Sequence, residues 1–153
     1  MSGATHLIDQ AKFSSRPLSV LIADEDRAVR ESCRQAAEGM GFAAAAAEDF
    51  PALLRRLSLR VTDLVVAGID LPGAEFPAMV SSIMALQPGV EVVLTGPQSS
   101  PDSILHAIKS GHHGFLLKPF RVQEFLSLLQ KVAARRQFPS AFPATDGHVR
   151  VRS

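Results

Sequence analysis

The chain lacks features that mark secreted, membrane-spanning and nucleic-acid-binding proteins. Its single cysteine excludes an internal disulfide, which is typical of proteins from the reducing cytoplasm. No apolar run approaches the roughly 20 residues of a membrane helix, and residues 1–17 lack the continuous apolar core of a secretory signal. The net charge of +1 provides no strong field to attract nucleic acid or an anionic membrane. We therefore expect a cytoplasmic protein with no direct nucleic-acid or membrane partner.

The length and composition instead indicate a folded domain with irregular ends. Hydrophobic residues make up 46% of the 153 residues, which is enough for a core. Residues 1–17 are small, polar and weakly patterned, and we expect a flexible N-terminal arm there. Residues 137–153 carry Pro139, Pro143 and Gly147 without periodicity, which is typical of a disordered tail or a linker. The predicted domain thus spans residues 18–136.

Short apolar segments alternate with helical patterns along this domain. The predicted strands are residues 18–23, 42–47, 64–67, 90–95 and 114–117. Apolar residues at helical spacing follow each strand, which predicts a helix after each one. The inner face of the first predicted helix consists of Val29, Cys33, Ala36, Ala37 and Met40, and that of the last consists of Val122, Phe125, Leu126, Leu129 and Val132. The fourth predicted helix begins at Pro101-Asp102. Asp26 and Asp49 are expected to cap the first two helices. Five strand–helix alternations predict an α/β fold with a parallel sheet covered by helices on both faces.

Polar residues stand at the carboxyl ends of the predicted strands, where ligands meet an open α/β sheet. Asp24 and Glu25 follow the first strand, Thr95 ends the fourth, and Lys118 follows the fifth. Paired carboxylates suit Mg²⁺, whereas a hydroxyl and an ammonium group suit a phosphoryl group. The central strand stops at Gly68, which has no side chain. The pattern is that of a magnesium-and-phosphoryl site with no chemical group at its centre.

Over about residues 18–136 the chain resembles the receiver domain of two-component response regulators. The segments that carry the resemblance are the acidic pair in residues 20–26, the stretch from Asp63 to Pro72-Gly73, Val93-Leu94-Thr95-Gly96, and residues 115–120. The resemblance implies a flavodoxin-like, doubly wound sheet of five parallel strands in the order 2-1-3-4-5. It also implies a signalling module rather than an enzyme, one that takes a phosphoryl group from a histidine kinase onto an aspartate with Mg²⁺.

By this resemblance, individual residues receive expected roles. Asp24 and Glu25 match the metal-binding acids, and Thr95 matches the switch hydroxyl. Phe115 matches the switch aromatic, and Lys118 matches the invariant lysine. We expect Lys118 to pair with Asp24 or Glu25, and any Mg²⁺ to bind weakly because one expected carboxylate is missing.

The chain departs from the family at the residue that should accept the phosphoryl group. That aspartate lies four residues before the proline of Leu71-Pro72-Gly73, and the position holds Gly68. Glycine supplies no carboxylate nucleophile, so the chain looks like an aspartate-less receiver, or pseudo-receiver. Asp70 is either a substitute acceptor or a solvated turn residue. Pro119 matches a proline that usually follows a cis peptide bond.

Three functions remain open from the sequence. The first is a module that acts by protein–protein interaction, independently of phosphorylation, on a sensor kinase, an output domain or another regulator. It could also form a homodimer through the fourth helix, fifth strand and fifth helix, with His106, Lys109, Arg121 and Gln123 as exposed candidates. The second is a phosphoacceptor that uses Asp70 or another carboxylate. The third is a sensor of a small anion bound beside Lys118 in the vacated pocket.

Overall fold

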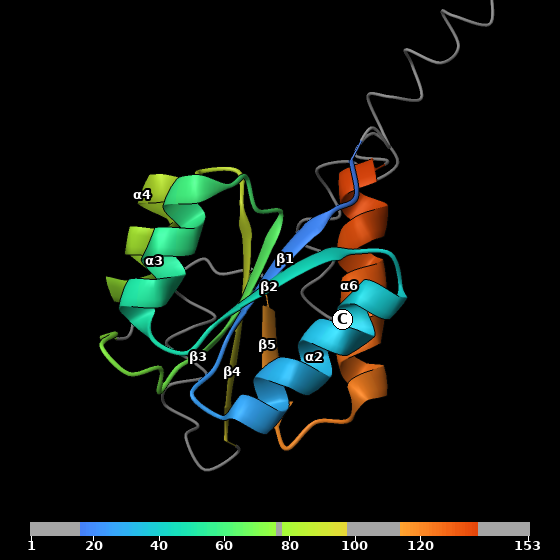
Figure 1. Ribbon diagram of the computed structural model, residues 1–153, viewed down its shortest axis with the longest axis horizontal. Helices are drawn as coiled ribbons and strands as arrows, with labels where there is room; N and C mark the ends of the chain where they lie inside the picture. Colours follow the sequence, from blue (N-terminus) through green and yellow to red (C-terminus); the bar gives the residue numbers. More distant parts are fainter. Residues whose placement is uncertain (1–15, 76–77, 98–113, 138–153) are drawn as a thin grey trace, which may run out of the picture.

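A five-stranded parallel sheet forms the centre of the protein (Figure 1). The structure is a computed structural model and describes residues 16–75, 78–97 and 114–137. The strands run in the order β2-β1-β3-β4-β5, which confirms the predicted topology. Their bounds are β1 Ser19–Ala23, β2 Ala43–Ala47, β3 Leu64–Gly68, β4 Glu91–Pro97 and β5 Gly114–Lys118. Each predicted strand ends within about two residues of an observed one, as expected for boundaries read from sequence.

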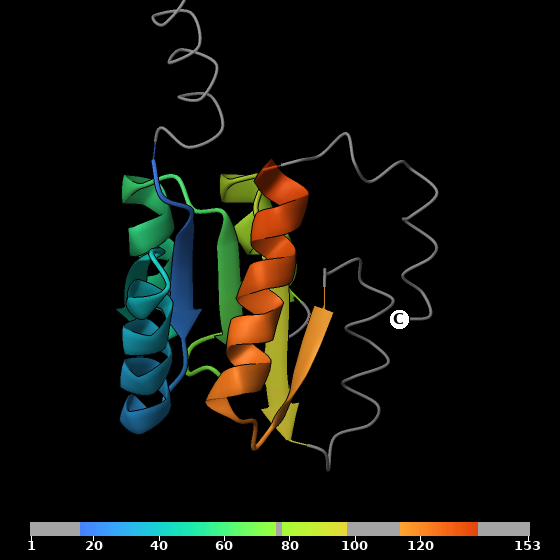
Figure 2. The same ribbon diagram turned by 90° about the vertical axis from the view of Figure 1, so that its right-hand side faces the viewer.

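Helices cover both faces of this sheet, as the alternating pattern predicts. Helices α2 (Arg27–Gly39) and α6 (Val122–Gln137) lie on one face, and α3 (Phe50–Leu59) and α4 (Ala78–Leu86) lie on the other (Figures 1 and 2). The helix expected at Pro101 lies outside the described residues. None of the described helices is both long enough and apolar enough to cross a membrane.

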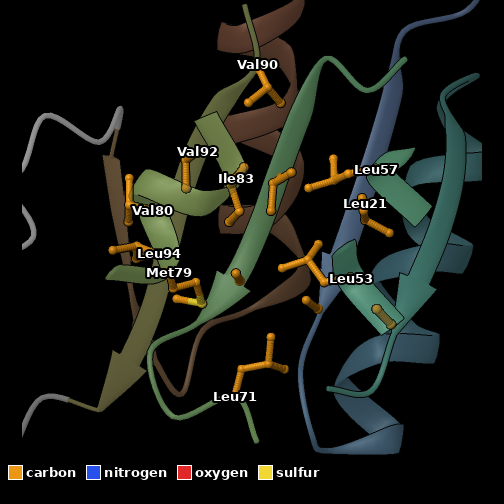
Figure 3. Close-up of a cluster of buried hydrophobic side chains, with 14 of the residues drawn as sticks. Leu21, Leu53, Leu57, Leu71, Met79, Val80, Ile83, Val90, Val92 and Leu94 are labelled. Atoms are coloured by element: carbon orange, nitrogen blue, oxygen red, sulfur yellow. The ribbon is translucent and has the colours of Figure 1, made fainter. Parts of the chain in front are cut away.

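Two hydrophobic clusters fill the layers because strand side chains alternate between faces. Leu21 and Val65 point to the α3–α4 side, where they meet Leu53 and Ile83 in the cluster drawn in Figure 3. Val20 and Ile22 belong to the second cluster, with Cys33 of α2 and with Phe125 and Leu129 of α6. Side chains of the strands therefore pack against hydrophobic clusters on both faces of the sheet, which fixes the positions of the strand ends relative to one another.

The predicted caps of α2 and α3 are confirmed, but two residues expected on the inner faces of helices are exposed. The Asp26 carboxylate accepts from the amides of Ala28 and Val29, and Asp49 caps α3 in the same way. However, Met40 is 36% exposed and Val122 is 44% exposed, although both were expected to face the core. Met40 is the C-cap of α2 and Val122 is the first residue of α6.

Candidate functional site

The carboxyl ends of β1, β3, β4 and β5 surround a small pocket. Because the strands are parallel, these ends lie at one edge of the sheet, and Gly68 is paired in register with Thr95. The pocket has a volume of about 40 Å³. Its lining residues are Asp24, Glu25, Gly68, Ile69, Asp70, Leu71, Thr95, Gly96, Pro97 and Lys118. The structure thus brings together the acids, the hydroxyl and the lysine that the sequence placed at one edge.

An ion pair between Asp24 and Lys118 dominates the pocket. The Lys118 Nζ lies 2.5 Å from Asp24 Oδ2, and the Asp24 side chain is 4% exposed. The other carboxylate oxygen, Oδ1, accepts a hydrogen bond from the Asp26 amide at 2.8 Å. Both oxygens of Asp24 are therefore engaged. The expected pairing of Lys118 with an acid is present, and it involves the buried Asp24 rather than the exposed Glu25.

The space beside Gly68 would accept a Cβ atom. A Cβ atom at residue 68 would lie 3.6 Å from both Asp24 Oδ2 and Thr95 Oγ1, which is ordinary van der Waals contact. Gly68 has no positive φ, so its backbone does not require glycine. The Thr95 hydroxyl is buried and has no hydrogen-bond partner within the described part of the chain. Buried hydroxyl groups in proteins usually have a hydrogen-bond partner, so Thr95 is an exception among the described residues.

The acids of the pocket do not form a tight cation site as they are arranged. Glu25 is exposed, whereas the oxygens of Asp24 are already taken by Lys118 and the Asp26 amide. Within residues 16–75, 78–97 and 114–137, no group of three or more His, Cys, Asp or Glu side chains could hold a metal ion. Mg²⁺ prefers near-octahedral oxygen ligands. A cation here would have to displace Lys118 from Asp24.

Asp70 lies at the rim of the pocket and is exposed to solvent. The turn that carries it is closed by the Leu71 amide, which donates to the Gly68 carbonyl at 3.1 Å. The preceding amide, that of Ile69, donates to the Thr95 carbonyl at 2.8 Å. This turn leaves the Asp70 side chain without a hydrogen bond to any described residue.

The aromatic and proline positions also adjoin the pocket. Phe115 is partly buried and packs on the core cluster of the α3–α4 face. A Cβ atom at Gly96 would lie 3.2 Å from Phe115 Cζ and 2.8 Å from Ile69 Cδ1, so a larger residue there would force the Ile69 side chain to shift. Sequence reasoning missed this constraint, because nothing local to Gly96 signals what packs against it. The Lys118–Pro119 bond is cis, as expected.

The expected partner surface is described only in part. His106 and Lys109 lie outside the described residues, and so does the helix that would carry them. Arg121 and Gln123 are exposed at the start of α6. The Arg121 amide donates to the Glu124 carboxylate at 2.8 Å, which fixes the first turn of this helix.

Similar sequences are found among bacterial transcriptional regulators. The chain is 24% identical over 129 residues to the DNA-binding transcriptional regulator NtrC of Azospirillum brasilense, covering 84% of this chain and 27% of the regulator. It is 26% identical over 119 residues to the C4-dicarboxylate transport regulator DctD of Rhizobium meliloti, covering 78% of this chain and 26% of that protein. The chain therefore spans about a quarter of the length of these relatives.

Solved structures share the fold. A CheY-like receiver domain protein from Methanospirillum hungatei has a TM-score of 0.73 at 20% identity, covering 80% of this chain and 98% of that one. The beryllofluoride-activated NtrC4 receiver domain dimer has a TM-score of 0.70 at 22% identity, covering 77% and 98%. The family model of the response regulator receiver domain matches residues 20–130. With the strand order and the pocket at the strand ends, this match shows that the chain belongs to the receiver domain family of two-component response regulators.

Proposed function

We propose that this receiver domain passes on its signal by protein–protein contact, without forming an acyl phosphate. The observation that carries the proposal is the Asp24–Lys118 ion pair beside Gly68. An acyl phosphate requires a carboxylate nucleophile. Gly68 has none, and Asp24 is buried with both oxygens engaged. The charges at the centre of the pocket are already paired, so the domain does not need a metal to relieve repulsion between carboxylates.

The partner in this proposal is a sensor kinase, an output domain, another regulator or a second copy of the chain. The exposed residues Arg121 and Gln123 at the start of α6 belong to the candidate surface. The similar NtrC4 receiver domain forms a dimer, which makes self-association the first case to examine. The single cysteine, Cys33, is buried, and burial raises its pKa to about 11, which suits an inert thiol in the cytoplasm.

Phosphodonor labelling tests the proposal directly. The protein is incubated with acetyl phosphate and Mg²⁺, and its intact mass is measured under conditions that preserve acyl phosphates. We expect no gain of a phosphoryl mass. A Mg²⁺-dependent gain would overturn the proposal, and its loss in Asp70→Asn would identify Asp70 as the acceptor. Light scattering of the parent and of Arg121→Glu then tests the surface; monomers at all concentrations and no bound protein partner would argue against it.

A second candidate function is the binding of a small anion in the pocket. The buried Thr95 hydroxyl has no partner among the described residues, and the Lys118 ammonium has donors beyond the one that meets Asp24. The Asp24 carboxylate opposes this reading because it would repel an anion. Titration with inorganic phosphate, followed by NMR shifts of the Thr95 and Lys118 signals, separates the two candidates. Saturable shifts support a sensor, and unchanged spectra exclude phosphate as its ligand.

A further inference from the structure

A cluster of arginines and carboxylates lies at the opposite pole of the sheet, where the strands begin. It consists of Arg16, Asp63, Glu91, Arg135 and Arg136, and we call it the arginine–carboxylate cluster. Arg16 precedes β1, the two acids stand at the starts of β3 and β4, and the last two arginines lie in the last turn of α6. Figure 2 shows the start of β1 and the end of α6 at this same pole, away from the strand tips.

Asp63 is the buried centre of this cluster. Its side chain is only 4% exposed. Arg16 binds both of its oxygens, with Nη1 at 2.8 Å from Oδ2 and Nη2 at 3.1 Å from Oδ1, and the Ser19 amide donates to Oδ2 at 2.8 Å. Burial acts to raise the pKa of Asp63, but the hydrogen bonds from Arg16 and Ser19 outweigh it and hold the pKa below its usual value. This carboxylate is therefore charged and depends on its cationic partners.

Arg136 is shared between the two acids. Its Nε lies 3.3 Å from Asp63 Oδ1, its Nη1 lies 3.7 Å from Glu91 Oε2, and Nη1 also donates to the Gly89 carbonyl at 3.0 Å. Glu91 has a closer partner in Arg135, at 2.5 Å. Arg16 and Arg136 thus approach the same oxygen of Asp63, and Arg16 holds the shorter contact.

The charges in the cluster do not balance. Three guanidinium groups face two carboxylates, so one cation is in excess. Arg16 is half exposed and can leave for solvent, whereas the buried Asp63 cannot. A buried carboxylate without a counter-ion is strongly unfavourable. If Arg16 leaves, the nearest described cation able to replace it is Arg136.

We propose that Arg16 and Arg136 compete for Asp63, so that release of the segment before β1 tightens the last turn of α6 onto the sheet. The cluster would then couple the two ends of the described fold through one buried carboxylate. Withdrawal of Arg16 would therefore alter how Arg136 anchors the last turn of α6. This coupling does not involve the Gly68 pocket and does not depend on the function proposed for it.

Hydrogen exchange of the full chain tests the direction of the coupling. In Arg16→Ala, we expect the amides of residues 134–136 to exchange severalfold more slowly than in the parent, even though the whole domain is less stable. In Arg136→Ala, the same amides should exchange faster. Arg34→Ala is a matched control, because Arg34 also joins two acids, Glu31 and Glu38, but on the surface of α2. It should leave the end of α6 unchanged.

A double-mutant cycle provides an independent measurement. Denaturant unfolding of Arg16→Ala, Arg136→Ala and the double variant should show a combined loss greater than the sum of the single losses, because each arginine partly replaces the other. If the double variant does not fold, Arg16→Lys and Arg136→Lys complete a milder cycle. Unchanged or faster exchange at residues 134–136 in Arg16→Ala, or strictly additive losses, would overturn the proposal. Either result would assign the arginines a purely stabilising role.

Discussion

Replacing Gly68 with aspartate should build a metal-responsive site without disturbing the fold. The Cβ of the new side chain would lie 3.6 Å from Asp24 Oδ2 and Thr95 Oγ1, so this atom displaces no neighbour. Since Gly68 has no positive φ, any residue can adopt its backbone conformation. Removing the freedom of glycine in the unfolded chain should contribute about 0.4–1 kcal/mol of stability. The steric and backbone terms of Gly68→Asp are therefore close to neutral or slightly favourable.

Electrostatics should outweigh this small gain when metal is absent. The new carboxylate would stand roughly 5 Å from that of Asp24, where two like charges repel by about 3 kcal/mol at an effective dielectric constant near 20. Lys118 would offset much of this, but it already binds Asp24 and would have to serve two acids. We expect a net loss of about 1–2 kcal/mol at neutral pH without Mg²⁺. For a chain of this size that corresponds to a fall in Tm of about 2–8 °C.

Mg²⁺ should then restore the stability of the variant and not affect the parent. Two paired carboxylates form a better oxygen site than Asp24 alone, which Lys118 occupies. A ligand at ten times its Kd stabilises the folded state by about 1.4 kcal/mol, which raises Tm by about 3–6 °C. Differential scanning calorimetry with and without millimolar Mg²⁺ measures this, with Gly68→Asn as the uncharged control. An equal rise in the parent, or no greater rise in Gly68→Asp than in Gly68→Asn, would refute the reasoning.

Three further substitutions test other parts of the structure. Asp63→Asn should lower the free energy of unfolding by about 2–4 kcal/mol at pH 7, because Arg16 and Arg136 lose the charged partner that they share. Since the pKa of Asp63 is lowered on folding, this contribution is present at neutral pH and is lost as the pH falls through that lowered pKa, which acid titration of stability would show. Thr95→Val should leave the free energy of unfolding unchanged or raise it by up to about 1 kcal/mol, since the buried hydroxyl has no partner among the described residues. A decrease of more than about 1 kcal/mol in urea unfolding would mean that the hydroxyl makes a stabilising hydrogen bond. Gly96→Ala should cost about 1–3 kcal/mol through contact with Ile69, and Ile69→Val should recover part of it in the double variant.

Much of the fold follows from local patterns in the sequence. The alternation of apolar segments and helical stripes, with caps such as Asp26 and Asp49, was sufficient to predict five parallel strands with helices on both faces. Even the five alanines of β2, which have little strand propensity, were placed correctly by their position in the alternation. Parallel strands bring their carboxyl ends together, so the residues of the pocket could also be named in advance.

The tertiary structure decided which of those residues interact and at what distance. The sequence placed Asp24 and Glu25 at the strand end near Lys118. In the folded chain Lys118 pairs with Asp24, which is buried, whereas the Glu25 side chain is exposed to solvent. The tight space at Gly96 comes from the side chains of Ile69 and Phe115, which belong to another turn and another strand. Such packing depends on side-chain directions that no local pattern records.

The arginine–carboxylate cluster shows most clearly what the sequence determines and what only the folded structure decides. The sequence by itself determined that Arg16 precedes the first strand and that Arg135 and Arg136 close the last helix. Each of these arginines could equally have been a solvated surface residue. Only the folded chain brings Arg16 and Arg136 to the same buried oxygen of Asp63, across 120 positions of sequence. Ion pairs of this kind depend on burial and on distances of a few ångströms between remote segments, and both quantities exist only once the sheet has assembled.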